Sequence, residues 1–94
     1  MIVYEAAIIF EAGMDKEANE VWTCVVPPDE AISRVVQRNG LSEEASRARV
    51  TAQMSNEERV QRSHVVLSTL WEPEFTQQQV EKAWALLLKR IAAV

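Results

Sequence analysis

Three short apolar runs divide the chain into segments. They are MIVYEAAIIF (residues 1–10), VWTCVVP (21–27) and HVVLSTL (64–70). All three are rich in aliphatic and β-branched residues, which is typical of strands that are covered on both faces. The polar stretch between the first two runs contains Gly13 and predicts a loop or a short helix. We therefore expect three buried strands, the first of about eight residues.

Helix start and stop signals fill the stretch between the second and third runs. A helix is predicted to begin at Pro28, which suits a first helical turn, and to end at Asn39-Gly40, a pair that tolerates left-handed backbone. Ser42 is the expected N-cap of a second helix. Ser55, followed by Glu58, forms a capping box that predicts a third helix ending near residue 62.

The last quarter of the chain predicts one longer helix. The stretch WEPEF reads as a turn, and Thr76 with Gln79 reads as a second capping box. Apolar residues then recur at helical spacing and predict a buried face, made of Val80, Trp84, Leu87, Leu88 and Ile91.

Strands that alternate with helices predict an α/β fold with a parallel sheet. The two helices within residues 41–62 exceed what a simple crossover between strands needs. They are rich in arginine and offer few apolar residues for packing. We expect them to form a loosely packed lid over the carboxyl ends of the strands.

Charge is distributed unevenly along the chain. The net charge of -4 argues against a general nucleic-acid binder, which would normally be basic. Residues 1–30 hold seven acidic residues against one lysine, whereas residues 31–62 hold six arginines against four glutamates. Arginine offers a planar fork of N–H donors, so this middle segment suits a planar anion such as phosphate.

Five charged residues are candidates for a site. Arg34 and Arg38 lie four residues apart and share one helix face, and Arg49 shares a face of the next helix with Gln53. Spacing alone favours a solvated polar surface for these arginines. Glu5 falls inside a predicted strand, where a carboxylate needs a partner or a metal, and Glu11 follows that strand.

Several kinds of site are excluded or disfavoured. The chain has two glycines, so neither G-x-x-x-x-G-K-[ST] nor G-x-G-x-x-G can be written in it. His64 is expected to be structural, at the mouth of a strand, and Cys24 to be a small buried hydrophobe. The three tryptophans are expected to pack in the core and at its edge; they are Trp22, Trp71 and Trp84.

The cellular surroundings of the chain also follow from composition. A lone cysteine fits a reducing compartment, no apolar run is long enough for a membrane span, and the start lacks a signal-peptide pattern. We expect an intracellular protein of the cytoplasm or the mitochondrion, with no nucleic acid as a partner.

The order of these motifs resembles the C-terminal half of dephospho-CoA kinases, over essentially all of the chain. AAIIFEAG (6–13) looks like that family's strand-end segment. Residues 21–55 resemble its fourth strand, the following helix and the lid, where Arg-x-x-x-Arg-x-Gly and Arg-aliphatic-x-x-Gln recur. The matching residues are Arg34, Arg38, Gly40 (shifted by one at Asn39), Arg49, Val50 and Gln53. The tail, 64–90, is most similar to the kinase domain of animal bifunctional coenzyme A synthase.

The resemblance implies part of a P-loop-kinase-like parallel sheet of about three strands, with an inserted helical lid. It implies ATP-dependent phosphorylation of the 3′-hydroxyl of dephospho-CoA, the last step of coenzyme A biosynthesis, with ATP and Mg²⁺. Arg34, Arg38 and Arg49 would face the nucleotide, and Arg34 and Arg49 would also act in catalysis. Glu5 and Glu11 would be carboxylates on the substrate or metal side, without a direct metal ligand. Three other arginines are expected to stay mostly solvated; they are Arg47, Arg59 and Arg62.

The chain departs from the family pattern at several positions. Glu5 stands where the family has Asp, Ala7 where it has proline, and Ser68 and Thr69 where many members have Asp-x-x-Asn. The family's Walker A loop would precede residue 1, so we expect the 94 residues to be inactive alone and to need an N-terminal half as a partner. In the sheet order 2-3-1-4-5, the central strand would be missing between the first two runs, leaving unpaired edges. The alternative is a truncated, non-catalytic interaction module.

Overall fold

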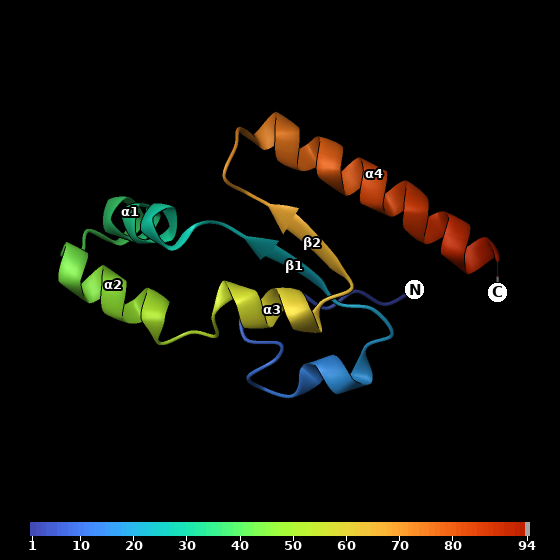
Figure 1. Cartoon of the computed structure of the whole chain (residues 1–94), viewed down its shortest axis with the longest axis horizontal. Coiled ribbons are helices and arrows are strands. Elements are labelled where there is room, and N and C mark those ends of the chain that lie inside the picture. The colour runs from blue at the N-terminus through green and yellow to red at the C-terminus, as the bar shows by residue number, and fades with distance from the viewer. Residues whose placement is uncertain (94) are drawn as a thin grey trace.

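The computed structural model describes residues 1–93, and its centre is a short parallel sheet. Strand β1 (Trp22–Val25) pairs with strand β2 (Val65–Ser68) in parallel, with Trp22 opposite Val65 and Val25 opposite Ser68. A 3₁₀ helix, η1 (Met14–Glu17), precedes β1. Three helices connect the strands, and a long helix, α4 (Pro73–Ala92), follows β2 (Figure 1). The predicted α/β class and the parallel pairing are therefore confirmed.

The connecting helices begin and end where the sequence signals place them. Helix α1 (Pro28–Asn39) ends at Gly40, which adopts the left-handed conformation with φ of 66°. Helix α2 (Glu43–Thr51) begins after Ser42, whose Oγ accepts a hydrogen bond from the Ala45 N–H at 3.1 Å. Helix α3 (Asn56–Arg62) begins after Ser55, whose Oγ accepts from the Glu58 N–H at 3.3 Å.

The prediction of a strand in residues 1–10 is wrong, and within residues 1–93 the sheet has two strands rather than about three. Residues 1–6 have no regular structure, and residues 7–13 form turns that end at Gly13, with φ of 74°. A strand needs a neighbour for its backbone N–H and C=O groups. Within residues 1–93, β1 and β2 pair only with each other, and the apolar run joins neither of them.

The predicted capping box in the last helix is also wrong. Helix α4 begins three residues earlier than Thr76, at Pro73, which occupies the first turn after Glu72. The two side chains that were expected to cap it bond the end of β2 instead: Thr76 Oγ1 donates to the Ser68 C=O at 3.4 Å, and Gln79 bonds the same residue. A long-range contact thus replaces the local one that the sequence suggested.

The core is small. Its buried apolar members come from all parts of the chain and are Phe10, Val21, Ile32, Leu67 and Ala83. The predicted buried face of α4 is mostly exposed: Trp84 is 44% exposed and Ile91 51%, because α4 meets β2 along only one side. Cys24, expected to be buried, is exposed, and so is Trp71 at 64%. Sequence periodicity identified an apolar stripe but not what covers it.

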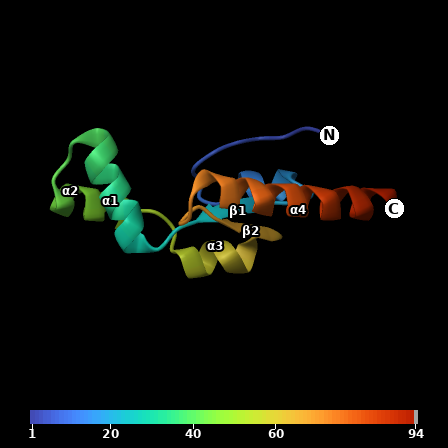
Figure 2. The same ribbon diagram turned by 90° about the horizontal axis from the view of Figure 1, so that it is seen from above.

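The molecule is more extended than a compact domain of its length. Its radius of gyration is 15.0 Å, against about 12 Å for a compact chain of this size. Its accessible surface is 7282 Å², about a third more than the roughly 5,500 Å² expected for its mass. Helices α1 and α2 pack on each other and lie to one side of the sheet, α3 and α4 (Figures 1 and 2). Much apolar surface is consequently open to solvent.

One ion pair ties the C-terminal end of α4 to the segment before β1. The carboxylate of Glu20 accepts hydrogen bonds from Trp22 Nε1 at 2.7 Å and from Arg90 Nη2 at 2.5 Å. The hydrogen bond from Trp22, and then Arg90, hold the pKa of Glu20 below its ordinary value of 4.5. A carboxyl whose pKa is lowered by folding stabilises the fold above its ordinary pKa, and this contribution is lost as the pH falls through the lowered value.

We expect Glu20→Gln to make the thermal stability of the chain depend less on pH in the acidic range. Thermal melts of the unmodified chain should lose stability steeply as the pH falls below about 4.5, whereas the variant should start lower and fall less. Glu17→Gln is the matched control, because Glu17 is exposed and its neutralisation should leave the slope unchanged. Parallel curves for Glu20→Gln and the unmodified chain would contradict this role.

Candidate functional site

Arg34 lies at the edge of the sheet where both parallel strands end. It projects from α1, and its Nη2 donates to the Thr69 C=O at 2.6 Å while its Nη1 donates to Thr69 Oγ1 at 3.3 Å. Thr69 directly follows β2, and its N–H donates to the Val25 C=O at the end of β1 at 3.0 Å. In open parallel α/β sheets, ligands bind outside the carboxyl ends of the strands.

The guanidinium of Arg34 retains free donor capacity. Its third nitrogen, Nε, donates to Glu30 Oε1 at 3.1 Å, so all three nitrogens are engaged. A guanidinium carries five N–H groups, and three bonds leave one N–H on each terminal nitrogen. The side chain is 41% exposed. Arg34 is thus held in place by Thr69 and Glu30 and keeps two unbonded N–H groups, one on each terminal nitrogen, for an anion.

A shallow hollow of about 490 Å³ opens beside this arginine. Thr69 and Thr76 contribute hydroxyl groups to its wall, and Trp71 contributes an exposed indole. The full lining is Arg34, Thr69, Trp71, Pro73, Thr76 and Gln77. The hollow combines a cation, hydroxyl groups and an aromatic surface, a set that suits a ligand with both an anionic and a planar part.

The other predicted arginines do not line this hollow. Arg38 is exposed in the last turn of α1, where its Nε donates to Asn39 Oδ1 at 3.1 Å. Arg49 is exposed in the last turn of α2, which packs on α1 rather than on the sheet. Arg47 forms a surface pair with Glu43 at 3.4 Å, as the i, i+4 spacing predicts. Of the candidate arginines, Arg34 alone lines the hollow described here.

The two candidate carboxylates also lie away from Arg34. Glu5 is exposed on the N-terminal segment. Glu11 pairs with Arg59 on α3 at 3.5 Å, and the Arg59 side chain is 16% exposed. The prediction that Arg59 stays mostly solvated is therefore wrong, because the N-terminal segment folds back onto α3.

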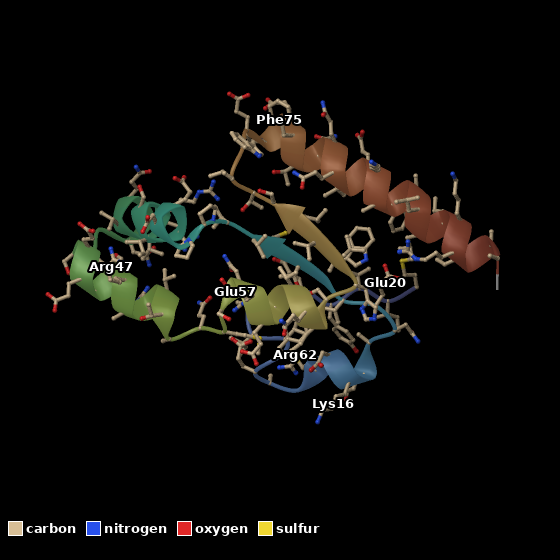
Figure 3. All side chains as sticks on the ribbon, viewed as in Figure 1. Lys16, Glu20, Arg47, Glu57, Arg62 and Phe75 are labelled. Atoms are coloured by element: carbon tan, nitrogen blue, oxygen red, sulfur yellow. The ribbon has the colours of Figure 1, made fainter. Side chains whose placement is uncertain are left out.

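Arg62 strengthens the same contact and stays exposed, as expected. Its Nη2 lies 3.5 Å from Asp15 Oδ2, and its guanidinium lies 4.8 Å from the centre of the Phe10 ring. Figure 3 shows Arg62 between α3 and the segment that carries η1. Arg59 and Arg62 of α3 thus bind the N-terminal segment, and this contact gives both arginines a structural role.

His64 serves the structural role that was predicted for it. Its Nδ1 accepts a hydrogen bond from the Val21 N–H at 2.9 Å, immediately before β2. Within residues 1–93, no three His, Cys, Asp or Glu side chains lie where they could hold a metal ion together. No helix in this part of the chain has the length and apolar character needed to cross a membrane.

Sequence reasoning missed the residues that support Arg34. Thr69 was noted only as a departure from a family pattern, and Gln79 only as a local cap. Both act through hydrogen bonds to partners distant in sequence, Thr69 with Arg34 and Gln79 with Ser68. The three consecutive glutamines carry no local sign that one of them differs from the others.

The fold and this edge define the class of protein: a parallel α/β arrangement, compatible with part of a P-loop-kinase-like fold, with an arginine at the carboxyl edge of the sheet. The sequence model of the dephospho-CoA kinase family matches residues 1–70. The chain belongs to the dephospho-CoA kinase family.

Individual relatives agree with this family. The dephospho-CoA kinase of Geobacter sulfurreducens is 37% identical over 83 residues, which cover 88% of this chain and 42% of that protein. That of Symbiobacterium thermophilum is 34% identical over 83 residues, or 88% of this chain and 35% of the relative. The dephospho-CoA kinase of Syntrophus aciditrophicus is 31% identical over 90 residues, which cover 96% of this chain and 38% of that protein. The chain thus spans about two fifths of the length of the relatives it matches.

Proposed function

We propose that these 94 residues are the C-terminal half of a dephospho-CoA kinase domain. Joined to the remainder of that domain, they would help transfer the γ-phosphoryl group of ATP to the 3′-hydroxyl of dephospho-CoA. The observation that carries this proposal is Arg34, held by Thr69 at the carboxyl edge of the sheet with two N–H groups to spare. Phosphoryl transfer depends mainly on such positioning and charge stabilisation.

The other candidate residues have roles in the same proposal. Arg49 reaches the nucleotide when α2, within the lid of residues 41–62, closes over the sheet edge. Arg38 faces the nucleotide from α1, the helix that also carries Arg34. Arg49 then joins Arg34 in stabilising the transferred group. Glu5 and Glu11 belong to the substrate side of the cleft. Mg²⁺ accompanies ATP in this proposal.

The partner in this proposal is the other half of the kinase domain, and its strand joins the free edge of β1. The outer edge of β2 is closed at Ser68, whose N–H and C=O both bond the side chain of Gln79. The sheet order leaves the far edge of β1 without a neighbouring strand. A sheet order of 2-3-1-4-5 would place the missing central strand there, and the same strand would pair with the run 1–10, which forms no strand here.

The type of kinase domain and its compartment belong to the same proposal. The tail, 64–90, corresponds to the kinase domain of animal bifunctional coenzyme A synthase, although the relatives named above are bacterial. The compartment is the cytoplasm or the mitochondrion. The second candidate function is a non-catalytic interaction module, favoured by the exposed apolar side chains of the N-terminal segment and α4.

A hybrid enzyme separates these two functions. The segment of the Geobacter sulfurreducens kinase that aligns with this chain is replaced by the chain's own residues. We expect the hybrid to form ADP in the presence of dephospho-CoA and the 94-residue chain alone to form none. A hybrid that melts cooperatively yet has no activity would favour the interaction module.

A further inference from the structure

At the end of β2, the side-chain amide of Gln79 on α4 makes the hydrogen bonds that a neighbouring strand would make. Its Oε1 accepts a hydrogen bond from the Ser68 N–H at 2.8 Å, and its Nε2 donates to the Ser68 C=O at 2.9 Å. The N–H and C=O of one strand residue point to the same side, where a further strand would normally bond them. The amide of Gln79 supplies the same donor and acceptor from a helix.

The peptide unit that joins Ser68 to Thr69 is consequently held on both sides. Its C=O accepts from Gln79 and, at 3.4 Å, from Thr76 Oγ1, while its N–H donates to the Val25 C=O at 3.0 Å. A planar peptide unit fixed at both its N–H and its C=O has little freedom to rotate. The next carbonyl along the chain, that of Thr69, is the one that accepts from Arg34.

We infer that Gln79 is a positioning residue for Arg34, acting through Ser68 and Thr69. The hydrogen bonds form a continuous path from α4 through the end of β2 to the guanidinium on α1. Without Gln79, the end of β2 loses its outer partner, the Thr69 carbonyl moves, and the arginine loses its orientation toward the hollow. The value of this role for catalysis rests on the proposed function, but the positioning itself can be measured without catalysis.

The test is nuclear magnetic resonance of the full 94-residue chain. In the unmodified chain, the Ser68 amide should exchange slowly with solvent, although it points away from β1. In Gln79→Leu, the Arg34 Nε–H signal should shift and broaden together with the Ser68 and Thr69 amides. Gln78→Leu is the matched control, since Gln78 is the preceding residue of the same helix and is exposed; it should leave Arg34 unchanged.

A second variant covers the case in which Gln79→Leu fails to fold. Gln79→Glu keeps the acceptor for the Ser68 N–H and loses the donor to the Ser68 C=O, so the Arg34 signal should shift in the same direction but less. Rapid exchange of Ser68 in the unmodified chain would overturn the inference. An Arg34 signal that stays unchanged while Ser68 shifts would overturn it as well.

Catalysis adds an independent readout in the hybrid enzyme. There, Gln79→Leu should lower kcat by about ten- to a hundredfold, the scale of a small misplacement of a catalytic group, while Gln78→Leu keeps the activity of the parent hybrid. If the NMR response appears and the hybrid has no activity at all, the proposed function fails while the positioning role stands.

Discussion

Arg34→Met is expected to reduce turnover of the hybrid kinase about a thousandfold, the scale seen when an arginine or an oxyanion donor is removed from a transferring group. Methionine keeps the length of the apolar stem and a good helix propensity, so α1 should survive the change. What is lost is a guanidinium anchored on Thr69 at 2.6 Å that keeps two unbonded N–H groups. The measurement is ADP formation at saturating ATP and dephospho-CoA.

Two further variants make this result specific. Arg47→Met removes an arginine from a surface pair with Glu43 and should leave kcat unchanged. Arg34→Lys keeps the charge but not the fork, so it should restore only a small part of the activity. If Arg34→Met retained more than a tenth of the parent activity, Arg34 would not stabilise the transferred group.

Ile32→Ala is expected to have the largest effect on stability. Ile32 is 4% exposed and is the one buried residue of α1. Truncating a buried isoleucine to alanine costs about 2 to 5 kcal/mol, because burial is lost and a cavity remains. A chain of this length with so small a core has only about 5 kcal/mol to lose. The thermal unfolding transition of the 94-residue chain should therefore move far down in temperature or lose its cooperativity.

A matched isoleucine on another helix tests whether burial is the cause. Ile91 on α4 is 51% exposed, so Ile91→Ala should change the free energy of unfolding by no more than about 0.5 kcal/mol. Chemical denaturation of both variants gives the comparison. Equal losses at the two positions would show that α1 is not anchored through Ile32.

Local signals in the sequence predicted the helices and the two paired strands well. Ser42 and Ser55 each mark a helix start through a hydrogen bond within one turn. Pro28 marks one through its fixed backbone angle, and Gly40 ends a helix through its own backbone conformation. Such signals do not depend on what lies elsewhere in the fold. The same holds for β-branched runs that pair directly with each other, as β1 and β2 do.

Predictions that depended on distant partners failed. The run 1–10 has the composition of a buried strand, yet no strand among the described residues pairs with it. Trp84 and Ile91 recur at helical spacing, but β2 covers only the adjoining side of α4. Thr76 and Gln79 matched a local capping pattern, whereas their hydrogen bonds reach Ser68. A sequence pattern indicates which strands and side chains need a partner. The rest of the fold determines whether that partner is present.

The candidate site could likewise be predicted from the sequence only in part. Arg34 was identified by its resemblance to the family motif, and the structure places it at the carboxyl edge of the sheet. The residues that hold it there, Thr69 and Gln79, carry no local signature. Arg38 and Arg49 stay predictions, since both are exposed and neither lines the hollow beside Arg34.

Activity of the hybrid kinase tests the central claim most directly. We predict that replacing the aligned segment of the Geobacter sulfurreducens enzyme with this chain gives a folded protein that forms ADP and coenzyme A from ATP and dephospho-CoA. We further predict that Arg34→Met abolishes nearly all of that activity. A hybrid that melts cooperatively and yet transfers no phosphoryl group would contradict the claim that this chain is half of such a kinase.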